Sequence, residues 1–196
     1  MAHTLALSTF LKLATIPLDQ QIGQLSAYDE PGGYDYYRAT KRAIRGNAHS
    51  DFAKASATIA RIERDGERED GAVVAEAVRK RFGRGPLVAP PRALWTSPKK
   101  VFSVRVEPEI AIPSATGLQT VAIYPTKSVP IRRASAGAAI RLMDDALNPV
   151  VSGPISCAVY DARRNRLYSS PTNTSDELLK TLTELLEWRL GRDNAA

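Results

Sequence analysis

The feature of this sequence that most constrains its fold is a change of hydrophobic period across a proline- and glycine-rich stretch, residues 83–98. Before this stretch, apolar side chains recur every three or four residues, which is the spacing of amphipathic helices. After it, Phe102, Val104 and Val106 alternate with polar residues, which is typical of a half-buried strand. The change predicts an α+β protein with a helical N-terminal half.

The order of the predicted elements follows from this change of period. Helices are predicted near residues 4–15, 18–27, 34–46, 50–64 and 70–82. Strands are expected only after about residue 100, near residues 102–106, 120–124, 155–160 and 166–168, with helices over 134–147 and from 174 onward. The C-terminal half is therefore predicted to be β-β-α-β-β-α. We divide the chain into a helical region (1–84), a connection (85–100) and an α+β region (101–196), an arrangement also compatible with one continuous domain.

Several local signals refine these bounds. Ser50 is predicted to cap the helix that follows it, and Thr174 and Glu177 have the spacing of a capping box. The dipeptide Asp65-Gly66 predicts a turn. Ile110 and Ile112 keep the parity of the strand at 102–106, so that strand is predicted to run past the proline at 108 as an edge or bulged element.

Composition excludes several classes of protein. With 43% hydrophobic and 24% charged residues, the chain is expected to be globular, because disordered chains have fewer apolar side chains. Cys157 is the single cysteine, so no disulfide can form within the chain. It alternates with Ile155 and Val159, and we expect a buried thiol without a ligand. Because no stretch approaches about 20 apolar residues and no targeting signal is visible, we expect a cytoplasmic protein without a membrane partner.

Catalytic signatures are absent from the sequence. There is no phosphate-binding glycine loop, no dinucleotide-binding fingerprint and no paired-histidine metalloprotease motif. His3 and His49 are the two histidines, and with Cys157 they stand in three distant regions. We therefore expect no cofactor and no metal site, and a protein that is not an enzyme.

One alternative is enzymatic. The order helix-strand-strand-helix-strand between Asp70 and Tyr160 is similar to the core of the PD-(D/E)XK nuclease superfamily. The resemblance implies a divalent metal held by Glu107 or Glu109, with Lys127 as the lysine of the motif. It covers about 90 residues in element order only. Pro125 stands where the superfamily has its second acidic residue.

Basic side chains give a different prediction. The net charge is +6, which favours polyanionic partners. Four cations recur at i, i+3, i+4 and i+7, with Tyr34 one turn earlier: Arg38, Lys41, Arg42 and Arg45. We predict that all four are solvent-accessible on one face of the helix, with Ala39, Ala43 and Ile44 on the other side. They can then neutralise phosphates while the tyrosine stacks on a base. The alternative is that they pair with carboxylates of the same chain, such as Asp35, Glu63 or Glu67.

A second basic group lies at a predicted hairpin tip and comprises Arg163, Arg164 and Arg166. Together the two groups favour a non-enzymatic module that binds nucleic acid or an acidic protein surface. A third alternative is a subunit of a larger assembly that binds another protein. Its contact would be the apolar N-terminal helix, which carries Leu5, Leu7, Phe10, Leu11 and Leu13.

Overall fold

The computed structural model describes residues 3–17, 20–21 and 36–193. The helices with assigned bounds are α1 (Leu7–Thr15), α3 (Arg38–Asn47), α4 (Phe52–Ile59), α5 (Asp65–Phe82), α6 (Arg133–Leu147) and α7 (Asn173–Asp193). The strands are β1 (His3–Ala6), β2 (Ala93–Thr96), β3 (Phe102–Val106), β4 (Ile110–Ser114), β5 (Gly117–Tyr124), β6 (Ile155–Asp161) and β7 (Arg166–Tyr168). The predicted α+β class is confirmed.

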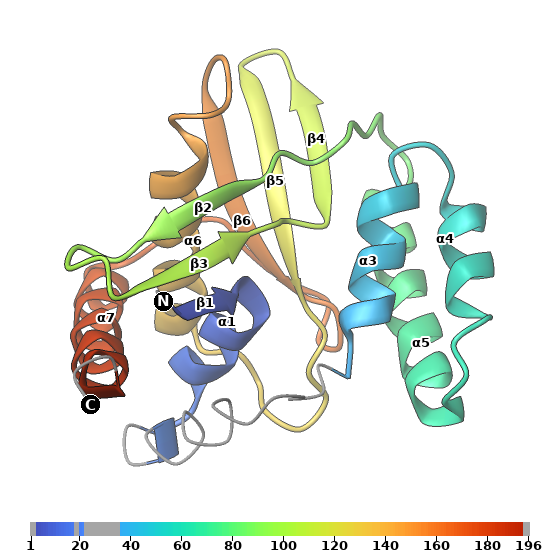
Figure 1. Ribbon diagram of the computed structural model, residues 1–196. Helices are drawn as coiled ribbons and strands as arrows, with labels where there is room; N and C mark the ends of the chain where they lie inside the picture. The colour runs from blue at the N-terminus through green and yellow to red at the C-terminus, as the bar shows by residue number, and fades with distance from the viewer. Residues whose placement is uncertain (1–2, 18–19, 22–35, 194–196) are drawn as a thin grey trace.

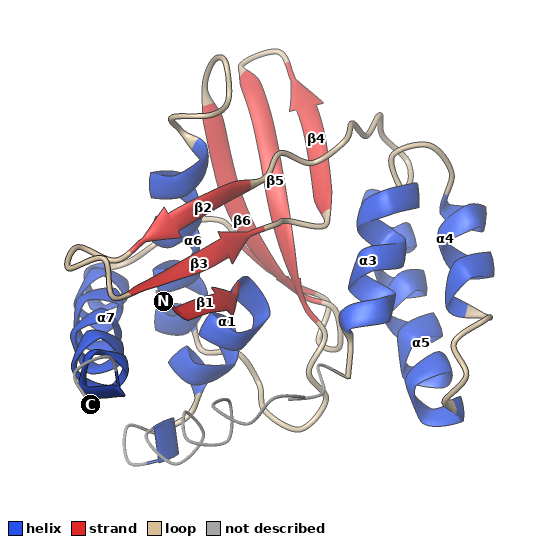
Figure 2. Cartoon of the chain, viewed as in Figure 1, coloured by secondary structure: helices blue, strands red, loops and turns tan. Residues whose placement is uncertain are grey.

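The strands form two sheets (Figure 2). In the first, sheet A, β3 lies between β1, with which it is parallel, and β2, with which it is antiparallel. In the second, sheet B, the strand order is β4-β5-β6-β7. Only β5 and β6 are parallel in sheet B, and α6 connects them. This crossover places the ends of β5 and β6, Tyr124 and Asp161, side by side at one edge.

Sheet B is buried on both faces. Along β5, Val121 and Ile123 face a core formed with α3, α4 and α5, while Ala122 and Tyr124 face a core formed with α1, α6, α7 and sheet A. Figure 1 shows the two groups of helices on opposite sides of this sheet. Burial on both faces explains the nearly continuous apolar runs of the two parallel strands.

The prediction that strands occur only after about residue 100 is wrong, because β1 and β2 precede that point. The predicted N-terminal helix includes residues 4–6, but residues 3–6 pair with β3 from His3↔Phe102 to Ala6↔Arg105. Pairing with a distant strand overrides the local pattern. β2 is a four-residue edge strand, a position in which nearby prolines remove no ladder hydrogen bond.

The predicted continuation of the strand at 102–106 past residue 108 is also wrong. The chain leaves sheet A after Val106 and enters sheet B as β4 at Ile110, so the two segments belong to different sheets. Ile110 faces the α3–α5 core, whereas Val106 faces the α1–α6–α7 core. The residues between them therefore form the junction of the two sheets.

Helix ends differ from the predictions in detail. Asp51, not Ser50, caps α4, since its carboxylate accepts a 2.7 Å hydrogen bond from the Ala53 amide. At the start of α7, the Ser175 hydroxyl accepts from the Thr172 amide at 3.0 Å, two residues ahead of the predicted capping box. α5 begins at Asp65, where a turn was predicted.

The remaining predictions concern the cysteine, the second helix and a membrane span. The thiol of Cys157 is buried, as predicted. The predicted helix at 18–27 falls mostly outside the described residues, as does Tyr34. No helix within the described ranges has the length and apolar character needed to span a bilayer.

Candidate functional site

The predicted basic stripe on α3 is divided into a buried half and an exposed half. The Lys41 ammonium lies 3.2 Å from Glu109 Oε1, and Arg45 Nη2 lies 2.9 Å from the same oxygen. The side chains of Lys41, Arg45 and Glu109 are 8%, 15% and 0% exposed. The prediction that all four cations are solvent-accessible is therefore wrong for Lys41 and Arg45.

The Glu109 cluster, which we define as Lys41, Arg45, Glu107 and Glu109, joins α3 to the junction between the two sheets. Arg45 also donates to Glu107 Oε2 at 2.8 Å and to the backbone carbonyls of Glu107 and Pro108 at 2.6 and 3.2 Å. Glu109 Oε2 accepts from the Ile123 amide at 2.7 Å. Each charge thus has a partner of opposite sign, which is the condition under which ions are tolerated in a protein interior.

Arg38 and Arg42 occupy the exposed side of α3. Within the described ranges, no carboxylate forms an ion pair with either guanidinium. Ala43 and Ile44 are buried as predicted, whereas Ala39 is exposed. Successive helical residues are separated by about 100°, so the four positions of the stripe do not all point in one direction. Arg38 and Arg42 face the solvent, whereas Lys41 and Arg45 face the sheet.

The residues that the nuclease resemblance selects are engaged with different partners. Glu107 and Glu109 bind Arg45, while Lys127 is 75% exposed and its ammonium lies 3.6 Å from Asp70 Oδ1. In the part of the chain that the structure describes, no group of three or more His, Cys, Asp or Glu side chains has the geometry to hold a metal ion.

The second predicted basic group, at the β6–β7 hairpin, lies next to the start of α3 (Figure 1). The Arg163 guanidinium donates to Asp70 Oδ1 of α5, to the Tyr37 hydroxyl at 3.1 Å and to the Pro125 carbonyl at 3.2 Å. Arg163 is therefore not a free loop-tip cation, because it joins the hairpin to α5 and to the residue before α3.

Asp70 is the acceptor at the centre of this arrangement. The Tyr36 hydroxyl donates to its Oδ2 at 3.2 Å. Partial burial opposes ionisation of Asp70, but the hydrogen bond and charge of Arg163 outweigh it and lower the pKa of the carboxyl group. Burial and the same carboxylate raise the pKa of Tyr36. Asp70 is thus ionised at neutral pH and the tyrosine is not.

The hairpin also fixes the segment that follows β5. Asp161, at the end of β6, accepts from the backbone amides of Arg163 and Arg164, each at 3.1 Å. The Arg164 side chain donates to the carbonyls of Thr126 at 3.4 Å and Lys127 at 3.2 Å. The Arg166 guanidinium lies 5.1 Å from the centre of the Tyr168 ring, a cation–π distance.

The contacts of Arg163 thus join the hairpin, which carries the second predicted group, to α5 and to the residue before α3, the helix that carries the first. We define the basic surface as the exposed cations of α3, of the segment after β5 and of the hairpin: Arg38, Arg42, Lys127, Arg164 and Arg166. Sequence reasoning assigned Lys127 to a different role and gave Asp70 none. A basic residue directly after a buried strand, near the end of a parallel neighbour, is the signal that could have placed Lys127 here.

The apolar N-terminal helix is not available as a protein contact. Phe10, Leu11 and Leu13 are fully buried in the core formed by α1, α6, α7 and sheet A. This packing accounts for the apolar character of the segment, which the sequence alone left open to a binding role.

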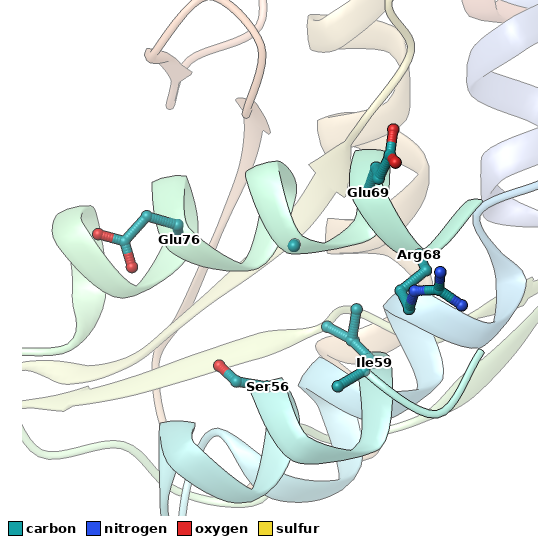
Figure 3. Close-up of a pocket in the computed structure, with 7 residues that line it drawn as sticks. Ser56, Ile59, Arg68, Glu69 and Glu76 are labelled. Atoms are coloured by element: carbon teal, nitrogen blue, oxygen red, sulfur yellow. The ribbon is translucent and has the colours of Figure 1, made fainter. Parts of the chain in front are cut away.

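A shallow cavity of about 290 Å³ lies elsewhere, between α4 and α5. Figure 3 shows Ser56 and Ile59 of α4 facing α5, which carries Arg68, Glu69 and Glu76. Arg68 is bonded to Asp65 and Glu76 to Arg79, so two of these three charges are already paired. The cavity includes none of the residues predicted for a site.

Comparisons with known proteins give no family for this chain: no protein-family model matches it, and no curated protein matches it in sequence.

Proposed function

We propose that the chain is a non-enzymatic module that binds the backbone of a nucleic acid through the basic surface. The observation that carries the proposal is the contact of Arg163 with Tyr37 and Asp70. It joins the hairpin to the residue before α3, so two segments that carry basic groups and lie more than 100 residues apart in the sequence are held together. A cytoplasmic location, expected from the sequence, is part of the proposal.

The balance of charge supports a phosphate-rich partner. Exposed cations come from α3, from the segment after β5 and from the β6–β7 hairpin. The carboxylates among them, Asp70 and Asp161, already accept hydrogen bonds from arginines. Exposed cations on a surface attract polyanions and release the counterions condensed on them, which is the main source of sequence-independent affinity for nucleic acids.

The residue types favour a nucleic acid over an acidic protein. Protein interfaces contain an apolar centre surrounded by polar residues. Among the described residues, the exposed large apolar side chains are Val73, Val88, Leu94, Val150 and Trp188. Of these, only Val73 lies on α5, the helix that carries Asp70, and none lies on a segment that contributes a cation to the basic surface. Guanidinium groups without an apolar centre suit phosphate contacts.

Fluorescence anisotropy with labelled oligonucleotides across a salt series tests the proposal. We expect wild-type protein to bind single strands and duplexes, with log K falling linearly with log salt. Contact with about three phosphates gives a slope near −2 for single strands and near −3 for duplex DNA. The variant Arg38→Glu/Arg42→Glu is expected to lose most of this binding.

The matched control is Arg105→Glu/Lys180→Glu, which changes the charge equally at exposed positions on β3 and α7. It should retain most of the affinity. Equal losses in both variants would show that net charge alone attracts the polyanion. Binding of polyglutamate as tight as that of an oligonucleotide would favour an acidic protein partner, and no binding to any polyanion at low salt would overturn the proposal.

A further inference from the structure

The basic surface contains an anion receptor that is already filled by a side chain of the protein. Asp70 Oδ1 accepts from Arg163 and lies 3.6 Å from the Lys127 ammonium, while Oδ2 accepts from Tyr36 at 3.2 Å. Donors from the hairpin, from the segment after β5 and from the residues before α3 thus converge on one carboxylate. Two cations and a hydroxyl group around one anion are the donors that also bind phosphate oxygens.

The two cations are held very differently. Arg163 is 11% exposed and has further bonds to Tyr37 and Pro125, so it is fixed in place. Lys127 is 75% exposed, and its 3.6 Å distance to Asp70 is longer than a charge-assisted hydrogen bond of about 2.8 Å. An exposed ion pair with this geometry is weak and is exchanged easily.

The ammonium of Lys127 is not needed to hold its own segment. Arg163 and Arg164 donate to the carbonyls of Pro125, Thr126 and Lys127. The backbone around Lys127 is therefore anchored by other side chains. Its ammonium group can move to a new partner without disturbing the backbone.

We infer that Lys127 is a phosphate-contacting residue of the basic surface and that Asp70 is its internal competitor. On binding, a phosphate of the nucleic-acid backbone takes the Lys127 ammonium from Asp70, while Arg163 stays with Asp70. The inference rests on the proposed function. It adds Lys127 as a contact residue of the basic surface and Asp70 as a residue that lowers the affinity for the nucleic acid. Asp70 thereby limits binding to ligands with enough charge to compete with it.

A double-mutant cycle tests this exchange. The variants are Asp70→Asn, Lys127→Gln and the double variant, with anisotropy measured on a labelled single-stranded DNA of about 20 nucleotides. The Asp70→Asn substitution keeps a side-chain oxygen for Arg163 but removes the charge that competes for Lys127. We expect Asp70→Asn to tighten binding roughly fivefold at about 50 mM salt, because the phosphate no longer competes with a carboxylate for the Lys127 ammonium.

In the same assay, Lys127→Gln is expected to weaken binding and to reduce the magnitude of the salt slope by about 0.7, the value for one single-strand phosphate. The gain from Asp70→Asn should largely disappear in the double variant. The control Glu76→Gln removes another carboxylate of α5, one that pairs with Arg79 and Lys80, and should change affinity much less. Lys127→Arg keeps the charge and should retain the slope.

Each outcome decides the inference. An unchanged slope in Lys127→Gln would overturn it, as would an equal gain from Asp70→Asn with and without Lys127. Thermal unfolding identifies an unfolded Asp70→Asn variant, and the slopes of Lys127→Gln and Lys127→Arg then decide. A wild type that binds no oligonucleotide overturns the proposed function and this inference together, whereas a wild type that binds with unchanged Lys127→Gln affinity and slope overturns only the inference.

Discussion

Two clusters in this protein each contain a central carboxylate held by an arginine and a lysine, and they differ in their access to water. In the Glu109 cluster the central carboxylate is 0% exposed and both cations are largely buried. Around Asp70 the arginine is largely buried, but the lysine is 75% exposed. The comparison teaches that the same ionic chemistry holds elements together in one place and leaves a cation available in the other.

The difference follows from where the cations are attached. Lys41 and Arg45 lie on the side of α3 that faces sheet B, and both reach one carboxylate at the junction of the sheets. Lys127 lies in the segment that leaves β5, at the edge of the sheet, where its long side chain extends into solvent. Position in the fold therefore decides whether a basic residue is buried in an ion pair or exposed to solvent.

The largest expected effect concerns the centre of the buried cluster. Glu109→Gln removes the negative charge with which both Lys41 and Arg45 pair. The two largely buried cations then lack this partner. We expect the free energy of unfolding to fall by about 3–5 kcal/mol. Urea denaturation followed by circular dichroism measures the change.

Lys127→Gln is the matched control in the exposed cluster, with an expected loss of at most about 1 kcal/mol. Comparable losses in the two variants would contradict the distinction between the clusters. A Glu109→Gln variant as stable as wild type would show that the buried ion pairs contribute no net stability.

How far the sequence predicts these regions depends on the distance over which contacts form. The alternation of Phe102, Val104 and Val106 is local, and it predicted β3 and its start, although the predicted continuation past residue 108 was wrong. Residues 3–6 are a strand because they pair with that distant segment, and no local pattern carries that information. The same holds at Glu109, which lies where the chain passes from sheet A to sheet B.

The sequence likewise predicted some residues of the candidate surface but not their contacts. Spacing identified Arg38 and Arg42, and a hairpin tip identified Arg164 and Arg166. Spacing could not show that Lys41 and Arg45 turn toward Glu109, since the acids considered as partners lay nearer in sequence. The role of Asp70 depends on contacts with Arg163 and Lys127, which are distant in the chain and become neighbours only in the folded protein.

A smaller effect is expected from pH at the Asp70 carboxylate. Its pKa is lowered in the folded protein, where the hydrogen bond and charge of Arg163 outweigh the opposing effect of burial. The ionised carboxylate therefore stabilises the fold at a pH above its ordinary value of 3.8, and this contribution is lost as the pH falls through the lowered pKa.

The corresponding measurement is urea denaturation of wild type and Asp70→Asn from about pH 7 to about pH 3. Wild type should be more stable at neutral pH, and the difference should shrink as the carboxylate is protonated. A difference that stays constant over this range would mean that Asp70 acts through shape or hydrogen bonding and not through its charge.

The smallest expected effect is a difference in the response of the two clusters to salt, and it sharpens the comparison most directly. Mobile ions screen interactions between exposed charges over about 10 Å at moderate ionic strength, but they do not enter a buried cluster. The small loss of stability in Lys127→Gln should therefore vanish as salt rises from about 0.05 M to about 1 M. The larger loss in Glu109→Gln should persist over the same range, because Glu109 is fully buried. Both variants are compared with wild type by urea denaturation at each salt concentration, so that the general effect of salt on the protein cancels. A salt-independent loss in Lys127→Gln would place the lysine among the structural residues and remove it as a cation available for binding.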